Sequence, residues 1–109
     1  MNWKVSYFNQ DVVKNIEAWP KKIMAKYLRI VDLIEEHGAQ LGPPITDSLG
    51  DGLFEIRVKA QEGIGRAFFC YILDKEIIVL HAIIKKTQKT PKKDLELAKQ
   101  RMKEVKNES

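Results

Sequence analysis

A cationic stretch behind an apolar run is the part of the sequence best suited to bind an anion. Residues 77–84 are almost entirely apolar and rich in β-branched side chains, which is typical of a buried strand. Three lysines then follow: Lys85, Lys86 and Lys89. Thr90 is a good N-cap, Pro91 suits the first position of a helix, and the free N–H groups of a helix start attract anions. The stretch therefore predicts an anion site, and a solubilising loop behind an edge strand explains the lysines equally well.

Basic side chains on three neighbouring strands are expected to share one open face of a sheet. Because side chains alternate between the two faces of a strand, only one of two adjacent residues can belong to this set. The expected set is Arg57, Lys59, Arg66, either Cys70 or Tyr71, His81, and either Lys85 or Lys86. Guanidinium groups hold non-bridging phosphate oxygens and stabilise the charge of a phosphodiester transition state. A lysine crowded by arginines has a lowered pKa, which suits an acid or base near neutral pH.

Other kinds of chemistry lack residue support in this sequence. It contains no cluster of carboxylates, no HxxxH motif, no Gly-rich phosphate loop and no Ser/His/Asp spacing. Its single cysteine, Cys70, cannot form a disulfide within the chain, and no Cys/His spacing suits zinc. We therefore expect neither a metal nor a cofactor, and a reducing compartment.

Three consecutive strands joined by short turns would position the basic residues. Residues 53–59 alternate between an apolar side and a polar side that carries Arg57. A turn at residues 61–65 leads into a second strand at 66–73, and a tight Asp-Lys turn leads into a third at 76–84. Strands connected in this way pair antiparallel, so the sequence predicts a β-meander.

The remainder of the chain predicts one more strand and three helices. A short helix capped by Asn9 or Asp11 presents Val12, Ile16 and Trp19 on one face. The other expected elements are a strand at 3–8, a helix at 20–37 ended by Gly38, a loop at 38–52 and a helix at 91–105. The last helix has a narrow apolar stripe that suits packing on the sheet edge or docking another chain. The expected fold is α+β, with a strand, a two-helix hairpin, an antiparallel meander, a C-terminal helix and the helices on one face of the sheet.

Positive charge is concentrated at the C-terminal end of the chain. The 109 residues form one expected domain with a formal net charge of +4. Residues 85–109 hold nine Lys or Arg against four Asp or Glu, whereas residues 1–84 hold ten against eleven. This distribution favours a polyanion or an acidic partner, and a solvated lysine-rich helix is the alternative. No signal peptide and no apolar run long enough for a membrane span is apparent, so we expect a soluble cytoplasmic protein.

Three segments of the sequence carry a family resemblance. They read GLFEIRV, GRAFFCY and IVLHAIIKKTQKTPKKDLELAKQRMKEV, and they start at Gly52, Gly65 and Ile78. These segments resemble the HigB branch of the RelE/ParE toxin superfamily, in which KKTQKTP before an ELAKQR helix is a family signature. The resemblance covers the C-terminal half closely, and the order of elements suits the whole chain. It implies one RelE-like domain over residues 1–109.

The resemblance also implies the toxin of a type II toxin–antitoxin system. Such a toxin is a ribosome-dependent mRNA endoribonuclease, or mRNA interferase, that needs no metal. The ribose 2′-OH attacks the adjacent phosphate, which leaves a 2′,3′-cyclic phosphate and restricts the reaction to RNA. Arg57, Arg66 and Lys85 or Lys86 match the positions of the basic catalytic residues. The expected RNA-binding lysines are Lys59, Lys89, Lys92 and Lys93.

The general base and the partners follow less directly from the resemblance. The superfamily often completes its active site with a C-terminal Tyr or His, and this sequence has neither after His81. Tyr71 and His81 are the substitutes, although residues in apolar strands more often pack in the sheet. The implied partners are the ribosome, mRNA and a helix-turn-helix, HigA-like antitoxin in a heteromeric complex. The antitoxin is expected to bring an acidic or amphipathic segment to the basic face or to the last helix.

Two other functions compete with the nuclease. The first is a ParE-like inhibitor that binds DNA gyrase and cleaves nothing, because the superfamily includes both kinds of toxin. The second is a non-catalytic RNA-binding module, in which loss of Arg57 or Arg66 would weaken binding gradually instead of abolishing a reaction.

Overall fold

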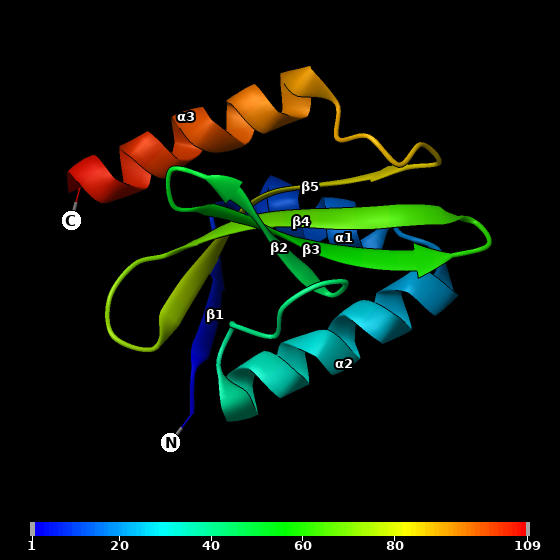
Figure 1. Cartoon of the computed structure of the whole chain (residues 1–109), viewed down its shortest axis with the longest axis horizontal. Helices are drawn as coiled ribbons and strands as arrows, with labels where there is room; N and C mark the ends of the chain where they lie inside the picture. Colours follow the sequence, from blue (N-terminus) through cyan, green and yellow to red (C-terminus); the bar gives the residue numbers. More distant parts are fainter. Residues whose placement is uncertain (1, 109) are drawn as a thin grey trace.

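The computed structural model describes residues 2–108, which contain five strands and three helices (Figure 1). In chain order these are β1 (Lys4–Tyr7), α1 (Gln10–Glu17), α2 (Lys21–His37), β2 (Thr46–Gly50), β3 (Leu53–Ala60), β4 (Gly63–Tyr71), β5 (Glu76–Lys85) and α3 (Lys92–Glu108). The predicted α+β class, the N-terminal strand, the helical hairpin and the meander are confirmed. No helix in the described part of the chain is long and apolar enough to cross a membrane.

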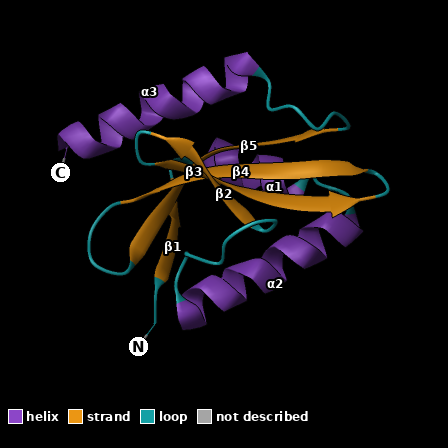
Figure 2. Ribbon diagram, viewed as in Figure 1, coloured by secondary structure: helices purple, strands orange, loops and turns teal. Residues whose placement is uncertain are grey.

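The five strands form one sheet in the order β1-β5-β4-β3-β2 (Figure 2). Strands β3, β4 and β5 pair antiparallel, as expected for short connections. The first strand pairs parallel to β5, with Lys4 beside Glu76 and Tyr7 beside Val79. Since this pairing stops at Val79, no strand of the described residues lies on that side of the second half of β5.

The helices cover both faces of the sheet, so the prediction that they share one face is wrong. Helices α1 and α2 pack on one face, where Val12, Ile16 and Ile23 join the larger apolar core. Helix α3 lies across the other face, where Ala98 and Met102 join a smaller core (Figures 1 and 2). The physical reason is that the central strands are apolar on both sides. Two faces that exclude water each require a covering layer.

The predicted loop at residues 38–52 contains a strand that we did not expect. Strand β2 pairs antiparallel with β3, with Thr46 opposite Ile56 and Ser48 opposite Phe54. The register shifts between Ser48 and Gly50, which marks a bulge. Its sequence, TDSLG, has little strand propensity, and an exposed edge strand does not require residues of high strand propensity. Backbone hydrogen bonds to β3 therefore form this strand, and the pattern of its side chains does not predict it.

Gly63 and Gly65 lie inside β4, whereas the sequence placed them in the preceding turn. A Cβ atom at Gly65 would lie 2.9 Å from Cγ2 of Ile23 and 3.0 Å from Cζ3 of Trp19. A Cβ atom so close to its neighbours would force Ile23 or Trp19 to move. Glycine is thus required here because the start of α2 packs directly on the backbone of β4.

A bulge in β5 decides which side chains face α3. Phe68 of β4 lies opposite His81, whereas the next residue, Phe69, lies opposite Val79. Leu80 is the extra residue, and it shifts the alternation of every later side chain by one position. His81 and Lys85 consequently lie on the same side of the sheet as Arg66.

The C-terminal helix begins slightly later than the sequence predicted. Its first residue is Lys92, and the carbonyl oxygen of Pro91 accepts a hydrogen bond from the N–H of Leu95. Pro91 thus precedes the helix, and Thr90 does not act as the N-cap. The hydroxyl of Thr90 instead donates to Glu55 on β3, because that buried carboxylate needs donors.

Candidate functional site

A buried glutamate joins two arginines on the α3 side of the sheet. Oε1 of Glu55 lies 3.2 Å from Nε of Arg57, and Oε2 lies 3.8 Å from Nε of Arg66. Oε2 also accepts a hydrogen bond of 2.9 Å from Oγ1 of Thr90. Only 2% of Glu55 is exposed, so its charge has lost most contact with water and depends on these partners. We call Glu55, Arg57 and Arg66 the arginine cluster.

The two guanidinium groups come from directly opposite positions on β3 and β4. Arg57 pairs with Arg66 in the register of the two strands, where like charges repel. Arg66 has no exposed surface. Burial, followed by the charge of Arg57, lowers the pKa of the Arg66 side chain, and Glu55 acts in the opposite direction. Two guanidinium groups against one carboxylate leave the arginine cluster with an excess of positive charge, which suits a phosphate ligand.

The loop of residues 86–91 closes over the arginine cluster, so the sheet face is not open as predicted. Nη2 of Arg57 donates to the carbonyl oxygen of Gln88, and Nη2 of Arg66 donates to that of Thr87. A loop has carbonyl groups without strand or helix partners, and a guanidinium group offers five donors. Within the described residues, Nη1 of Arg66 and the Nε atoms of Arg57 and Arg66 are buried and have no hydrogen-bond partner, so Glu55 contacts both arginines as ion pairs without hydrogen bonds. The arginines therefore hold the lysine-rich loop and keep unused donor capacity.

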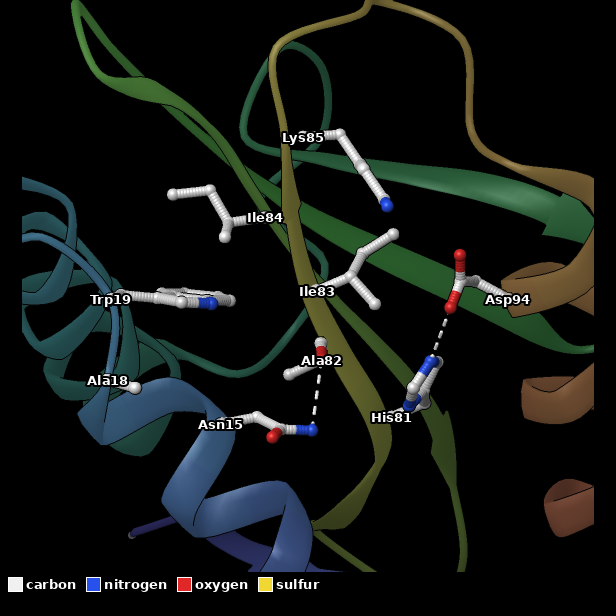
Figure 3. Close-up of a pocket in the computed structure, with 9 residues that line it drawn as sticks. All are labelled: Asn15, Ala18, Trp19, His81, Ala82, Ile83, Ile84, Lys85 and Asp94. Atoms are coloured by element: carbon white, nitrogen blue, oxygen red, sulfur yellow. Dashed lines mark hydrogen bonds and ion pairs between the residues drawn. The ribbon is translucent and has the colours of Figure 1, made fainter.

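A cleft of about 360 Å³ lies beside the half of β5 that extends beyond β1 (Figure 3). Its lining residues are Asn15, Ala18, Trp19, His81, Ala82, Ile83, Ile84, Lys85 and Asp94. Figure 3 shows His81, Ile83 and Lys85 on one side of the strand, and Ala82 and Ile84 on the other. Nδ2 of Asn15 donates to the carbonyl oxygen of Ala82 at 3.5 Å. The cleft thus places a lysine, a histidine and a carboxylate at the open edge of an apolar strand.

His81 connects β5 to α3. Its Nε2 atom lies 2.8 Å from Oδ1 of Asp94, and its ring stacks on Phe68 with centroids 5.9 Å apart. Nδ1 is buried and lacks a hydrogen-bond partner among the described residues. Neither ring nitrogen is therefore free toward the cleft in this structure. An acid or base role for His81 would require its separation from Asp94.

Of the two adjacent lysines, the structure places Lys85 on the face of the arginine cluster. Lys85 is the last residue of β5, lies opposite Ile64 and lines the cleft. Lys86 begins the loop that follows. The predicted RNA-binding lysines have exposed side chains: Lys59 at the end of β3, Lys89 in the loop, and Lys92 and Lys93 in the first turn of α3.

Tyr71 lies on the opposite face of the sheet from the arginine cluster, so it cannot join this site as the sequence allowed. Its ring packs edge-on against Trp3 at 5.8 Å and against Phe54 at 5.3 Å. Burial raises the pKa of its hydroxyl. Cys70 is the residue of the pair that shares the face of Arg66, and it is fully buried in the smaller core, where burial raises the pKa of its thiol.

Two acidic residues of the site were not identified from the sequence. Glu55 lies two residues before Arg57 on β3, and this i, i+2 spacing, which puts both side chains on one side of a strand, is the available signal for an ion pair. Asp94 lies in the first turn of α3, where a carboxylate is common for helix stability alone. No group of three or more metal-ligating side chains occurs in the part of the chain that the structure describes.

Comparisons with known proteins agree with this architecture. The family model of phage-derived Gp49-like proteins (DUF891) matches residues 14–103. A chain of the archaeal RelE–RelB complex from Pyrococcus horikoshii OT3 is similar in structure, with a TM-score of 0.56 and 21% sequence identity. The similarity covers 77% of this chain and 96% of that chain. At this identity the likeness establishes a shared, RelE-like fold. A search of curated proteins found no match.

Proposed function

The chain belongs to the phage-derived Gp49-like protein family, and from this premise we propose that it is the toxin of a toxin–antitoxin pair. More specifically, it is a HigB-like endoribonuclease that cleaves mRNA on the ribosome. The observation that carries this proposal is the pair Arg57 and Arg66, which lie on opposite positions of β3 and β4, on the same face of the sheet as Lys85 and under a lysine-rich loop. The RelE-like fold supports the same assignment.

The proposed reaction is attack of a ribose 2′-OH on the adjacent phosphate. The P–O2′ bond forms, the P–O5′ bond breaks, and the products are a 2′,3′-cyclic phosphate and a free 5′-OH. Arg57 and Arg66 hold the non-bridging oxygens and stabilise their growing charge. Lys85 lies at the mouth of the cleft and takes or gives a proton, or stabilises the same charge. Much of the rate would come from the ribosome, which aligns the mRNA.

The lysines around the loop supply the RNA-binding surface of this proposal. Lys86, Lys89, Lys92 and Lys93 are exposed and follow one another along the loop and into α3, and Lys59 is exposed at the end of β3. Their charges attract the phosphates that flank the cleaved bond. His81, held by Asp94, is the remaining candidate for the acid or base.

The partner of this toxin is a cognate antitoxin, and a helix-turn-helix protein of the HigA kind is our specific proposal. Because the excess charge lies in residues 85–109, we propose that an acidic or amphipathic antitoxin segment covers the basic surface. The affinity of the complex should then fall as salt rises. Binding that is insensitive to salt would contradict this proposal.

One observation favours a second function, a gyrase-directed toxin of the ParE kind without nuclease activity. Arg57 and Arg66 are already engaged by Glu55 and by two loop carbonyl groups. In that case the arginine cluster would only hold the loop in place.

Induction in cells that lack the antitoxin separates these functions. We would compare the wild type with Arg57→Ala/Arg66→Ala and with Lys22→Ala, an exposed lysine on α2. The nuclease predicts growth arrest with new mRNA 5′ ends inside translated codons, retained in Lys22→Ala and lost in the double variant. Because the double variant leaves the buried Glu55 without its partners and is expected to be less stable, circular dichroism must show that it is folded at the temperature of the experiment. Growth arrest without cuts and with a DNA damage response would instead indicate gyrase.

A further inference from the structure

Glu55 is a buried charge that the proposed cleavage does not use. Both of its oxygen atoms are engaged, Oε1 by Arg57 and Oε2 by Arg66 and Thr90. With 2% of the residue exposed, it reaches neither solvent nor a ligand. An apolar side chain would fill the same space without the cost of burying a carboxylate. Packing alone therefore does not explain why a carboxylate lies next to the two arginines.

The contacts of Glu55 determine how the two guanidinium groups are oriented. The carboxylate lies at the Nε atom of each arginine, at 3.2 Å and 3.8 Å. The Nη2 atoms of both arginines donate instead to two successive loop carbonyl groups, those of Thr87 and Gln88. Thus the Nε atom of each arginine lies within ion-pair distance of the carboxylate without forming a hydrogen bond in the described residues, and each Nη2 atom is directed to one of two neighbouring carbonyl oxygens. Nη1 of Arg66 is buried and without a hydrogen-bond partner within the described residues.

We propose that Glu55 is a positioning residue, which holds Arg57 and Arg66 side by side so that both bind one phosphate of the RNA. The carbonyl oxygens of Thr87 and Gln88 then mark where two non-bridging phosphate oxygens bind once the loop moves. The hydroxyl of Thr90, in the loop, donates a hydrogen bond to the same carboxylate, so Glu55 contacts both the loop and the arginines. This inference rests on the proposed nuclease function. It assigns Glu55 no contact with the substrate.

Without the carboxylate, two like charges would face each other across β3 and β4 with no group between them. Mutual repulsion would turn the side chains apart, and a misplacement of about 1 Å in a catalytic group can lower a rate by about 10²-fold. Binding of RNA depends mainly on the exposed lysines and would change little. Loss of Glu55 should therefore lower kcat far more than it raises KM.

The first test uses purified full-length protein and ribosomes programmed with a short mRNA. We expect Glu55→Gln to lower kcat by about 10²-fold, with KM changed by no more than about 2-fold. The matched control is Glu62→Gln, an exposed glutamate in the turn between β3 and β4, which should cleave as the wild type does. An unchanged kcat in Glu55→Gln would overturn the proposal. If Glu55→Gln does not fold, Glu55→Asp retains the charge but withdraws it from both arginines, and an unchanged kcat there is equally decisive.

A second readout does not depend on cleavage. In ¹⁵N-labelled protein, the Nε–Hε signals of Arg57 and Arg66 should be resolved and slow to exchange in the wild type and in Glu62→Gln. In Glu55→Gln they should shift and exchange faster while the backbone amide signals of β3 and β4 stay in place. If the wild type cleaves no RNA, the proposed function fails, and these signals still decide whether Glu55 orients the arginines. Unchanged arginine signals in Glu55→Gln would overturn the positioning role.

Discussion

The charged side chains of this protein differ sharply in how much of their surface is exposed to solvent. Arg66 and Glu55 are almost fully buried, whereas Lys85, on the same face, is exposed at the end of β5. Buried groups depend on their partners for stability, so their removal affects folding and chemistry together. An exposed lysine can be removed with little effect on folding. Lys85 is therefore the residue that tests the chemistry of the site most cleanly.

Replacing Lys85 by alanine should lower mRNA cleavage by about 10²-fold, the usual effect of removing one group that stabilises transition-state charge. Its thermal unfolding should remain that of the wild type because the side chain is exposed. The measurement is the single-turnover cleavage rate on programmed ribosomes. Lys22→Ala on α2 is the matched control. Equal rates for the two variants would remove Lys85 from the mechanism.

Close backbone contact at one residue also determines how α2 lies on the sheet. Gly65 leaves no room for a Cβ atom, which would meet Ile23 at 2.9 Å and Trp19 at 3.0 Å. We expect Gly65→Ala to lower the free energy of unfolding by about 1–3 kcal/mol, as overpacked cores do. Urea denaturation measures this change, with Gln61→Ala in the adjacent turn as the control. Unchanged stability would mean that α2 moves away from β4 at no cost.

Among the elements, α3 shows how a helix with a charged surface is attached to a sheet. Its buried residues Ala98 and Met102 supply the apolar contact, and Nη1 of Arg101 donates to the carbonyl oxygen of Leu80 at 2.8 Å. The guanidinium of Arg101 also lies 4.8 Å from the ring centroid of Phe8. At its first turn, Asp94 binds His81. Polar contacts thus hold both the first turn and the later part of α3, and apolar packing at Ala98 and Met102 adds to them.

Removing the contact at the first turn should therefore loosen α3 locally. Asp94→Ala leaves His81 without its partner at a site where the side chains are 19% and 11% exposed. We expect a loss of about 1–3 kcal/mol in stability, the cost of a partly buried group left unpaired. Backbone amides in the first two turns of α3 should exchange faster, while those near Met102 should not. Glu96→Ala, at an exposed position two residues further along α3, is the control, and equal exchange in both variants would contradict this role.

At the scale of the whole molecule, positive charge gathers where the loop of residues 86–91 meets the start of α3. The formal net charge of +4 arises from the C-terminal quarter of the chain, and this segment lies over the arginine cluster. A surface of this kind attracts polyanions at long range and loses affinity as salt increases. The arrangement suits both partners of the proposed toxin, the RNA and an acidic antitoxin segment.

Replacing Lys89, Lys92 and Lys93 together by alanine should weaken binding of a labelled single-stranded RNA. The slope of log affinity against log salt should fall by about 2, because each lost phosphate contact removes about 0.7 on a single strand. Fluorescence anisotropy at several salt concentrations measures this. The matched control replaces Lys4, Lys21 and Lys22, which are exposed away from the loop. Equal slopes for the two variants would place the RNA elsewhere.

Most of the fold follows from periodicity in the sequence. Alternation with a period of two marks β3, nearly continuous apolar runs mark β4 and β5, helical spacing marks α1, α2 and α3, and Asn9 caps α1 as its type suggests. The short turn between β3 and β4 keeps their pairing nearly local in the chain, and it places Arg57 opposite Arg66 on one face. These features depend on residues that are close together in the chain, so the local pattern of residue types is sufficient to predict them.

The tertiary structure decided what depends on distant partners. Pairing with β3 makes a strand of residues 46–50. A bulge at Leu80 brings His81 and Lys85 to the face of Arg66. Helix α3 covers that face. Glu55 becomes the anchor of the arginines only because Thr90 and the loop fold back over it. Backbone hydrogen bonds, register and the burial of a charge are set between segments far apart in the chain, and no local pattern of residue types records them.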